Sequence, residues 1–330
     1  MLEFTFLGTS SGTPSRTRNV SGLAVRATQA ETKQRDWFLI DAGEGTQHRL
    51  LSLPLSLQNL AAILITHAHG DHCYGLPGLL ASMAMDGRQR PLTIWGPQTV
   101  LDWLAQTFRL TDEEPPFALE YRATESEKTL VWNEHLVFHA RPLRHRVVTH
   151  AFEIGLHSRK RRLDLAALRS LGIPQGPLWK KAQRGETLVV GERSIPPDAV
   201  STLEDLHVSA ICGGDNAEPE ILAPYVEGLD LLIHEATYSE AVARKVGPAP
   251  MHSSVERVAR FAAERGIPHL ALTHFSPRHH ADMAALEAEA RQYYAGHLIL
   301  AEDGMRYVLD GHGRLACEQA GQEAEEGKRE

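Results

Sequence analysis

The sequence has little cysteine and no long apolar segment, and each shortage excludes a class of protein. Its 330 residues include three cysteines, Cys73, Cys212 and Cys317, which are too few for a disulfide framework. No apolar run approaches the roughly 20 residues that span a bilayer, so we expect no membrane-spanning helix. The segment Met1–Phe6 is typical of a strand and lacks the basic region of a signal peptide, so we expect a cytoplasmic protein.

The overall charge is negative, which argues weakly against a nucleic-acid partner. The formal net charge is −8 at pH 7, although a local basic patch can outweigh such a sum. The chain is 42% hydrophobic and 23% charged, and these values are typical of a globular protein. At this length it can form one large domain with insertions or two small domains.

A dense group of metal-binding side chains follows a predicted buried strand. The short apolar run Leu60–Ile65 is typical of such a strand, and His67, His69, Asp71 and His72 come directly after it. A lone histidine after a strand is usually structural or exposed. Four such groups in six positions would crowd imidazoles and a carboxylate together at a desolvation cost unless a cation binds them. We therefore predict a metal site at the end of this strand.

A metal centre of this kind needs further ligands from other parts of the chain. One zinc takes about four ligands, and a pair of ions needs more, including a shared carboxylate. Three downstream groups that follow predicted strands meet this need: His145, Asp215 and His274. Each alone would more often be structural, and other histidines, such as His139 and His150, are available. His139 is the weaker candidate because it lies inside a strand, where its ring is tied to one sheet face.

The spacing His-x-His-x-Asp-His resembles the signature of the metallo-β-lactamase superfamily of metal-dependent hydrolases. The resemblance implies an α/β fold, an αββα four-layer sandwich, with two Zn²⁺ per subunit, although Mn²⁺ or Fe²⁺ would also suit these ligands. It implies a ligand order as well: His67, His69 and His145 for the first ion, Asp71, His72 and His274 for the second, and Asp215 bridging both. A hydroxide shared by the ions would be the nucleophile, and Asp71 would orient it or accept its proton.

The composition changes at His157. Residues 159–184 hold eight Lys or Arg and a single acid, Asp164, and Gly and Pro interrupt them repeatedly. Such a segment is too basic and too broken to form a core element. We therefore expect residues 157–203 to be an inserted basic arm that protrudes from a catalytic domain spanning residues 1–310.

Strand-rich stretches followed by helices occur in both halves of the chain and favour a two-sheet sandwich with helices on its outer faces. We expect a polar turn over Glu31–Arg35 and helices over Tyr74–Met85 and Glu218–Val226. Residues 311–330 lack an apolar period and are rich in Glu, Gln and Gly, so we expect a flexible C-terminal tail.

Several longer stretches resemble the ribonuclease Z family, the tRNA 3′-processing endonucleases. They run in order along the chain as Phe6–Ser10, Pro14–Asn19, Asp41–Gln47, Gly172–Leu178, His234–Thr237 and His252–Ser254. The resemblance implies a homodimer in which the arm of one subunit holds precursor tRNA for the active site of the other. It also implies removal of the 3′ trailer after the discriminator nucleotide, which leaves a 3′-hydroxyl on the tRNA and a 5′-phosphate on the trailer.

Basic residues on two segments are the candidate RNA contacts. Arg16 and Arg18 follow the first strand and could hold phosphates near the ions, while Lys180, Lys181 and Arg184 belong to the arm. A protruding basic arm suits tRNA because phosphate contacts supply position and most of the affinity. The alternative for each of these residues is a solvated side chain on the surface.

The departing 3′-oxygen of such a substrate is a poor leaving group and benefits from a proton. His252 is the candidate general acid, and Glu235 is the candidate catalytic partner that orients it. The alternatives are that His252 caps the helix that follows it and that Glu235 fixes the imidazole of a metal ligand.

Three positions depart from the pattern of the family. Asn216 follows the bridging Asp where the family has Thr, Met251 precedes His252 where the family has Gly, and Gly304 replaces an aromatic residue. None of the three is a predicted ligand, so the departures concern the surroundings of the site and leave the predicted metal centre complete.

Two other functions compete with tRNA processing. A metallo-hydrolase or phosphodiesterase of the same superfamily that acts on small molecules would need no basic arm. A non-catalytic RNA-binding relative would need no complete set of metal ligands. The arm and the ligand set therefore both favour a metal-dependent nuclease.

Overall fold

The structure, a computed structural model, describes residues 1–28 and 36–318. The polar turn expected over Glu31–Arg35 lies outside the described residues. The chain divides into two compact units: unit 1 combines Met1–Leu156 with Val208–Glu330, and unit 2 is His157–His207. In the part of the chain that the structure describes, no helix is long and apolar enough to cross a membrane.

Unit 1 is built on two sheets, of which the first has eight strands in the order β17-β16-β1-β2-β3-β4-β5-β6. These strands are β1 (Leu2–Gly8), β2 (Gly22–Ala27), β3 (Trp37–Ile40), β4 (Leu60–Leu64), β5 (Leu92–Gly96), β6 (Leu119–Ala123), β16 (Arg306–Leu309) and β17 (Leu315–Glu318). Strands β3 to β6 pair in parallel, so their carboxyl ends lie along one edge of the sheet.

The second sheet has seven strands in the order β15-β14-β13-β12-β9-β8-β7. They are β7 (Thr129–Val131), β8 (Leu136–Pro142), β9 (His150–Leu163), β12 (Ser201–Cys212), β13 (Leu231–Glu235), β14 (His269–Thr273) and β15 (His297–Leu300). Strands β12 to β15 pair in parallel, and the loops after β12, β13 and β14 therefore meet at a common edge.

Aromatic side chains fill the space between the two sheets. Phe4 and Phe38 come from the first sheet and Phe138 and Phe152 from the second, and all four are buried in one apolar cluster. The rings of Phe38 and Phe138 meet with centroids 4.8 Å apart. Burial of this apolar area is the main force that holds the sheets face to face.

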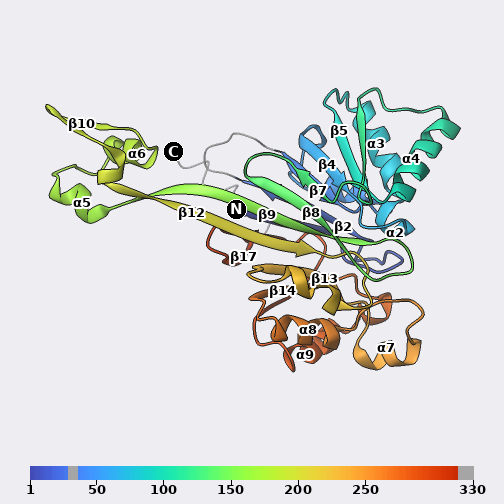
Figure 1. The fold of residues 1–330 in the computed structure, drawn as a ribbon. Helices are drawn as coiled ribbons and strands as arrows, with labels where there is room; N and C mark the ends of the chain where they lie inside the picture. Colours follow the sequence, from blue (N-terminus) through green and yellow to red (C-terminus); the bar gives the residue numbers. More distant parts are fainter. Residues whose placement is uncertain (29–35, 319–330) are drawn as a thin grey trace. The chain divides into compact units, whose positions relative to one another are not determined.

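Helices cover the outer faces of both sheets (Figure 1). The α-helices of unit 1 are α1 (Thr46–Leu50), α2 (Gly70–Cys73), α3 (Leu76–Met85), α4 (Gln98–Thr111), α7 (Glu240–Val246), α8 (Val255–Glu264) and α9 (Met283–Arg291). Helices α3 and α4 pack on the first sheet, and α8 and α9 pack on the second. The αββα sandwich predicted from the sequence is confirmed.

Two helices differ from their predicted form. The helix expected from Tyr74 begins at Leu76, because the short helix α2 and a turn come before it. The helix expected over Glu218–Val226 is a 3-10 segment, η3 (Pro219–Tyr225). Pro224 lies inside η3 and has no N–H to donate, which prevents a regular α-helix there.

The C-terminal tail expected from residue 311 begins later than predicted. Strand β17 pairs antiparallel with β16, and Leu315 packs against the core between the sheets. The edge of the first sheet supplies hydrogen-bond partners that a short polar sequence does not reveal. The rest of the expected tail, residues 319–330, lies outside the described residues.

Unit 2 is a folded unit with an apolar cluster of its own. It contains α5 (Leu165–Ser170), α6 (Pro177–Gln183) and a hairpin of β10 (Leu188–Val190) with β11 (Arg193–Ile195). Its buried apolar residues are Leu168, Ile173, Ala182, Leu188, Ile195 and Val200. The segment is thus an insertion separate from unit 1, as expected, and it has a small apolar cluster that its composition did not predict. Residue 203, the end predicted for the arm from composition, lies inside β12, and the unit extends to His207.

Candidate active site

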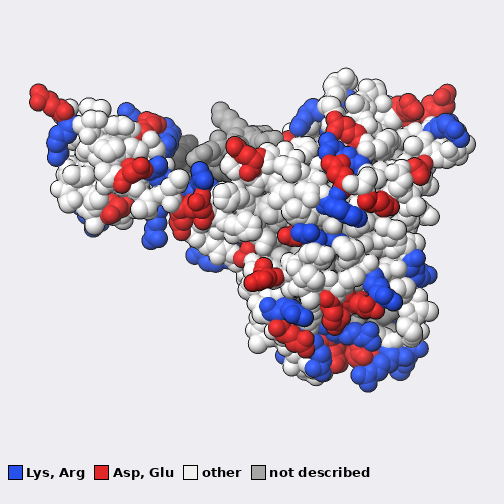
Figure 2. Space-filling model, viewed as in Figure 1, with Lys and Arg blue, Asp and Glu red and all other residues white. Residues whose placement is uncertain are grey.

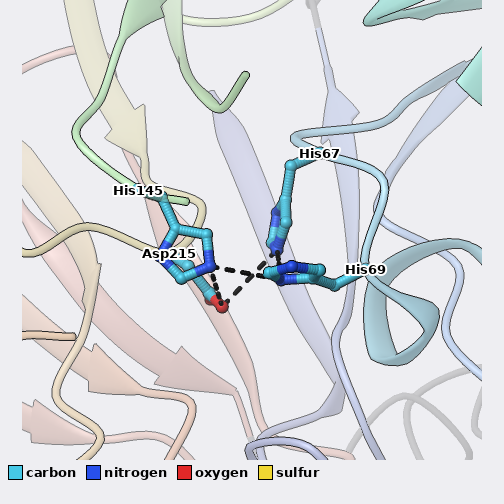
Figure 3. A group of neighbouring side chains, drawn as sticks. All are labelled: His67, His69, His145 and Asp215. Atoms are coloured by element: carbon cyan, nitrogen blue, oxygen red, sulfur yellow. Dashed lines mark hydrogen bonds and ion pairs between the residues drawn. The ribbon is translucent and has the colours of Figure 1, made fainter. Parts of the chain in front are cut away.

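Five histidines and two aspartates lie just after strands of the two sheets, in loops or on the short helix α2. His67, His69, Asp71 and His72 follow β4, Asp215 follows β12, His274 follows β14, and His145 lies between β8 and β9. The side chains of His67, His69, His145 and Asp215 point toward one another from three loops, of which the one after β4 carries both His67 and His69 (Figure 3).

The first group consists of three imidazoles and one carboxylate. Nε2 of His67 lies 3.0 Å from Nδ1 of His69, which lies 3.2 Å from Nε2 of His145. Oδ2 of Asp215 lies 3.5 Å from Nε2 of His67 and 3.6 Å from Nε2 of His145. Ligands of a tetrahedral zinc ion, at about 2.0–2.1 Å from the metal, are separated by similar distances.

The second group shares Asp215 with the first. Nε2 of His274 lies 3.3 Å from Nε2 of His72 and 3.3 Å from Oδ2 of Asp71. Oδ1 of Asp215 lies 3.3 Å from the Nε2 atoms of both histidines. Its two oxygens therefore face the two groups, and this is the arrangement that a bridging carboxylate requires.

Hydrogen bonds on the far side of each ring leave Nε2 free toward the cluster. Nδ1 of His67 lies 2.9 Å from Oγ1 of Thr66, and Nδ1 of His274 lies 3.0 Å from Oγ1 of Thr237. Each hydroxyl donates its own proton to a carboxylate, that of Asp41 or Glu235, so it accepts from the imidazole. Metal-bound histidines typically have such a partner for the other ring nitrogen.

In two more histidines, His145 and His72, Nε2 also faces the cluster while Nδ1 is held by a hydrogen bond. Nδ1–H of His145 donates to the carbonyl oxygen of Met251 over 2.9 Å, and Nδ1–H of His72 donates to Oδ2 of Asp41 over 2.7 Å. Four Nε2 lone pairs therefore converge with the carboxylate of Asp215. Oδ1 of Asp215 is buried and has no hydrogen-bond partner among the described residues, so a cation would satisfy it.

The protonation states of the first group suit metal binding. Burial lowers the pKa of His67 and His145, and it lowers that of His69 to about 4. These imidazoles are therefore neutral at physiological pH, and the neutral ring is the form that binds metals. Burial alone would also lower the pKa of His72, but the carboxylates of Asp215, Asp41 and Asp71 outweigh it and raise that pKa. The same negative potential favours a cation.

Asp41 is a site residue that the sequence analysis missed. It accepts the backbone N–H of Thr66 over 2.8 Å as well as the proton of His72, and so connects the end of β3 to the metal-binding loop. Its φ of 59° lies in the left-handed region, which Asp tolerates better than most residues. The sequence feature that could have indicated this role is an acidic residue at the end of a predicted strand, shortly before Gly43 and Gly45.

Glu235 and His252 lie together beside the cluster. Nδ1 of His252 is 3.2 Å from Oε1 of Glu235, and its ring lies between those of His145 and His274, with centroids 5.2 and 5.5 Å away. Burial lowers the pKa of His252, but the carboxylate of Glu235 overcomes this effect and raises it to about 9. His252 does not cap α8, because the side chain of Ser254 does so.

Glu235 also has a structural role. Besides His252 it accepts the backbone N–H groups of Asn216, Thr237 and Ser253. Asn216, a departure from the family pattern, accepts the N–H of Arg144 and donates to the His234 ring. Both residues thus hold the loops that carry Asp215 and His145 in place.

Arg18 is not placed to hold a phosphate, contrary to prediction. Its side chain is 7% exposed, and Nη1 donates to Oγ1 of Thr9 and to the carbonyl of Ala301, both over 2.6 Å. The guanidinium lies over the ring of Phe275. Arg16, two residues earlier, is exposed and has no hydrogen bond or ion pair within residues 1–28 and 36–318. Only Arg16 is available to a substrate.

The competing histidines lie outside the cluster. His139 on β8 contacts Oγ1 of Thr129 through Nδ1 at 3.0 Å. His150 is buried, and its backbone rather than its ring supports the site: its N–H donates to the carbonyl of Thr66, and its carbonyl accepts the N–H of Gly214. Neither the ring of His139 nor that of His150 belongs to a group of candidate metal ligands among the described residues.

The basic residues predicted to contact RNA in the arm lie on α6 or at its end. Lys180 and Lys181 are in the last turn, and Arg184 is the C-cap. Unit 2 has nine Lys or Arg and six Asp or Glu, and Arg159 and Arg161 pair with Asp205 and Asp198. Figure 2 accordingly shows basic and acidic side chains mixed on unit 2. Its net positive charge is smaller than residues 159–184 alone suggest.

Comparisons with known proteins show the family of the chain. A model of the beta-lactamase superfamily domain matches residues 36–162. Ribonuclease Z of Pseudomonas putida (strain GB-1) is 42% identical over 324 residues, which cover 96% of this chain and 98% of that protein. The chain belongs to the ribonuclease Z family. Another ribonuclease Z, from Marinobacter nauticus, is 40% identical over 94% of this chain and 97% of its own length.

A solved ribonuclease Z relative has the same fold. The crystal structure of the short form of human tRNase Z has a TM-score of 0.64 and 25% identity, over 93% of this chain and 99% of that one. The metallo-β-lactamase-fold protein YhfI of Bacillus subtilis has a TM-score of 0.63 at 18% identity, which shows similarity of fold. The predicted family and fold are therefore both confirmed for this ribonuclease Z chain.

Proposed function

We propose that the protein is a metal-dependent endoribonuclease that removes the 3′ trailer from precursor tRNA. The cut follows the discriminator nucleotide and leaves a 3′-hydroxyl on the tRNA and a 5′-phosphate on the trailer. Family membership supports the activity. The proposal rests on one observation: four Nε2 atoms of histidines lie around the two oxygens of Asp215, with their lone pairs directed into the same space. Such a set of electron donors is a site for cations, and a nuclease of this family needs one.

Two Zn²⁺ ions fit the donor set. His67, His69 and His145 would hold one ion, Asp71, His72 and His274 the other, and Asp215 would bridge them. Mn²⁺ or Fe²⁺ would be alternative occupants. When bound, such ions ionise a water as nucleophile and stabilise negative charge on the phosphoryl oxygens.

Asp71 is suited to orient the attacking water. Its carboxylate is 12% exposed, so it faces the open side of the cluster. Oδ2 accepts the N–H of Gly12 over 2.7 Å and lies 3.3 Å from Nε2 of His274, which fixes the side chain in one orientation. A carboxylate held in this way positions a water without having to reorganise during the reaction.

His252 would donate a proton to the departing 3′-oxygen. Nδ1 is bound by Glu235, so Nε2 is the nitrogen available to the leaving group. The contact with Glu235 keeps the ring protonated and fixes its orientation. The discriminator nucleotide, which carries the leaving oxygen, would therefore lie on the side of the site where His252 contacts His145 and His274.

Unit 2 would bind the tRNA body. Lys180 and Lys181 are the best candidates, since neither has an ion pair among the described residues. Arg184 is 73% exposed, and its ion pair with Glu186 is long, at 4.0 Å. A pair of this kind is weak, so a phosphate can compete with Glu186 for the guanidinium. In a homodimer, unit 2 of one subunit would serve the active site of the other.

Incubation with a precursor tRNA that carries a 3′ extension tests the function. We expect one cut after the discriminator nucleotide, with a 3′-hydroxyl on the tRNA and a 5′-phosphate on the trailer, and about two metal ions per chain by elemental analysis. Cleavage of bis(p-nitrophenyl) phosphate without any cut in the tRNA would instead favour a small-molecule phosphodiesterase.

A further inference from the structure

An exposed aromatic pair lies next to the metal-binding loop. Tyr74 is the C-cap of α2, two residues after His72, and its side chain is 57% exposed. Its ring packs against that of Trp103 on α4, with centroids 5.7 Å apart and planes tilted by 32°. Trp103 in turn packs against the apolar cluster beneath α3 and α4. The pair therefore has a buried support and one open face.

The Tyr74 ring rests on the loop that carries the metal-binding residues. Gly70 stands between His69 and Asp71, and a Cβ at Gly70 would lie 2.5 Å from Cε2 of Tyr74. Glycine thus allows the ring to lie directly on the backbone at this point. Because Gly70 and Trp103 both contact the ring, it has little freedom and is already oriented for a ligand, while 57% of its side chain stays exposed.

Burial does not explain this ring. Exposed apolar residues elsewhere on these helices are aliphatic, such as Met85 at 87% and Leu110 at 75% exposure. The hydroxyl of Tyr74 has no hydrogen-bond partner within the described ranges. A flat, exposed aromatic face beside a phosphodiester-cleaving site is suited to stack on a base of single-stranded RNA.

We propose that Tyr74, supported by Trp103, is a stacking platform for the base of the first trailer nucleotide. The inference rests on the proposed function and adds a binding site to it. The discriminator nucleotide carries the leaving oxygen and lies with His252 against His145 and His274. The first trailer nucleotide is attached to the same phosphorus through its 5′-oxygen, and its base would meet the exposed ring of Tyr74, two residues after His72.

The test compares two precursor tRNAs that differ only at the first trailer position, which is either an ordinary nucleotide or an abasic one. In the wild-type protein we expect the abasic substrate to lower kcat/KM roughly tenfold, about 1.4 kcal/mol, a value within the range measured for base–aromatic stacks. In Tyr74→Ala the ratio between the two substrates falls to about one. Because each ratio is measured within one variant, a general loss of activity cancels.

Two variants serve as controls. Tyr74→Phe keeps the aromatic face and retains the tenfold ratio. Leu110→Ala removes an exposed apolar side chain from the helix that carries Trp103, and both its ratio and its activity equal those of the wild type. A wild-type protein that cuts precursor tRNA without an abasic effect, or an equal effect in Tyr74→Ala, would overturn the platform alone. Failure to cut precursor tRNA at all would overturn the proposed function together with it.

Discussion

Replacing Arg18 with alanine distinguishes a structural role from RNA binding. The substitution removes two hydrogen bonds from a charged donor, to Thr9 and Ala301, and a guanidinium that covers Phe275. Each such hydrogen bond contributes about 1.5–3 kcal/mol, and two that share one nitrogen do not add fully. The ion pair to Glu302, at 3.8 Å with a carboxylate 58% exposed, adds little. We expect a loss of about 3 kcal/mol in the free energy of unfolding.

The loss of stability should have a counterpart in activity. Arg18 holds Thr9 at the start of a loop in which the N–H of Gly12 donates to Asp71. Loosening this loop disturbs the orientation of Asp71, so turnover of precursor tRNA and of bis(p-nitrophenyl) phosphate should fall together. A thermal melt should show a midpoint roughly 4 °C lower, since an unfolding entropy of about 2.1 cal/mol/K per residue makes 1 kcal/mol correspond to about 1.4 °C in a protein of this size.

Arg16 is the matched control two residues away. It is exposed, so Arg16→Ala should leave the melting temperature within about 1 °C of the wild type. If Arg16 contacts a phosphate, its loss should weaken binding of precursor tRNA. The slope of log K against log salt concentration should then fall by about one unit, because one counterion fewer is released on binding. The reasoning on Arg18 would be refuted by an unchanged melt of Arg18→Ala combined with a selective loss of RNA binding.

Three further substitutions test the chemistry and the arm. His252→Ala should lower kcat on precursor tRNA by about 10²–10⁴ and affect bis(p-nitrophenyl) phosphate far less, because nitrophenolate leaves without a proton; equal losses would argue against an acid. Asp71→Ala should nearly eliminate turnover while gel shifts show tRNA binding retained, and full activity would remove Asp71 from the mechanism. Replacing residues 157–207 with a short Gly-containing turn between Leu156 and Val208, on adjacent strands β9 and β12, should abolish tRNA cleavage and spare the small substrate. Undiminished tRNA cleavage by that variant would contradict the role of unit 2.

The candidate metal site could be predicted because its residues follow a local rule. His67, His69, Asp71 and His72 come after an apolar run, and the run is β4. His145, Asp215 and His274 were chosen because they match the ligand order that the resemblance to the superfamily implies; taken alone, each would more often be structural. The order of motifs along the chain was sufficient to predict the family, which the relatives confirm.

The expected helix over Glu218–Val226 failed for a local reason, the proline at position 224, whereas the other misses concern contacts between segments far apart in the sequence. Arg18 looked like a surface residue in a polar loop, and it is buried because Thr9, Phe275 and Ala301 surround it. Unit 2 was expected as an insertion outside the main core, and the cluster that its apolar residues form between Leu168 and Val200 was not predicted. Strand β17 was missed because its pairing partner is required to make it a strand.

The sequence by itself therefore determined the elements, the family and the chemical types in the site, since apolar period and ligand spacing are properties of neighbouring residues. Only the tertiary structure decided which polar side chains are buried and what each ring nitrogen contacts. Asp41, which orients His72, and Tyr74, which packs against Trp103, acquire these roles from contacts between segments far apart in the sequence. Burial and hydrogen bonding depend on the packing of whole sheets and loops, and no short stretch of sequence encodes them.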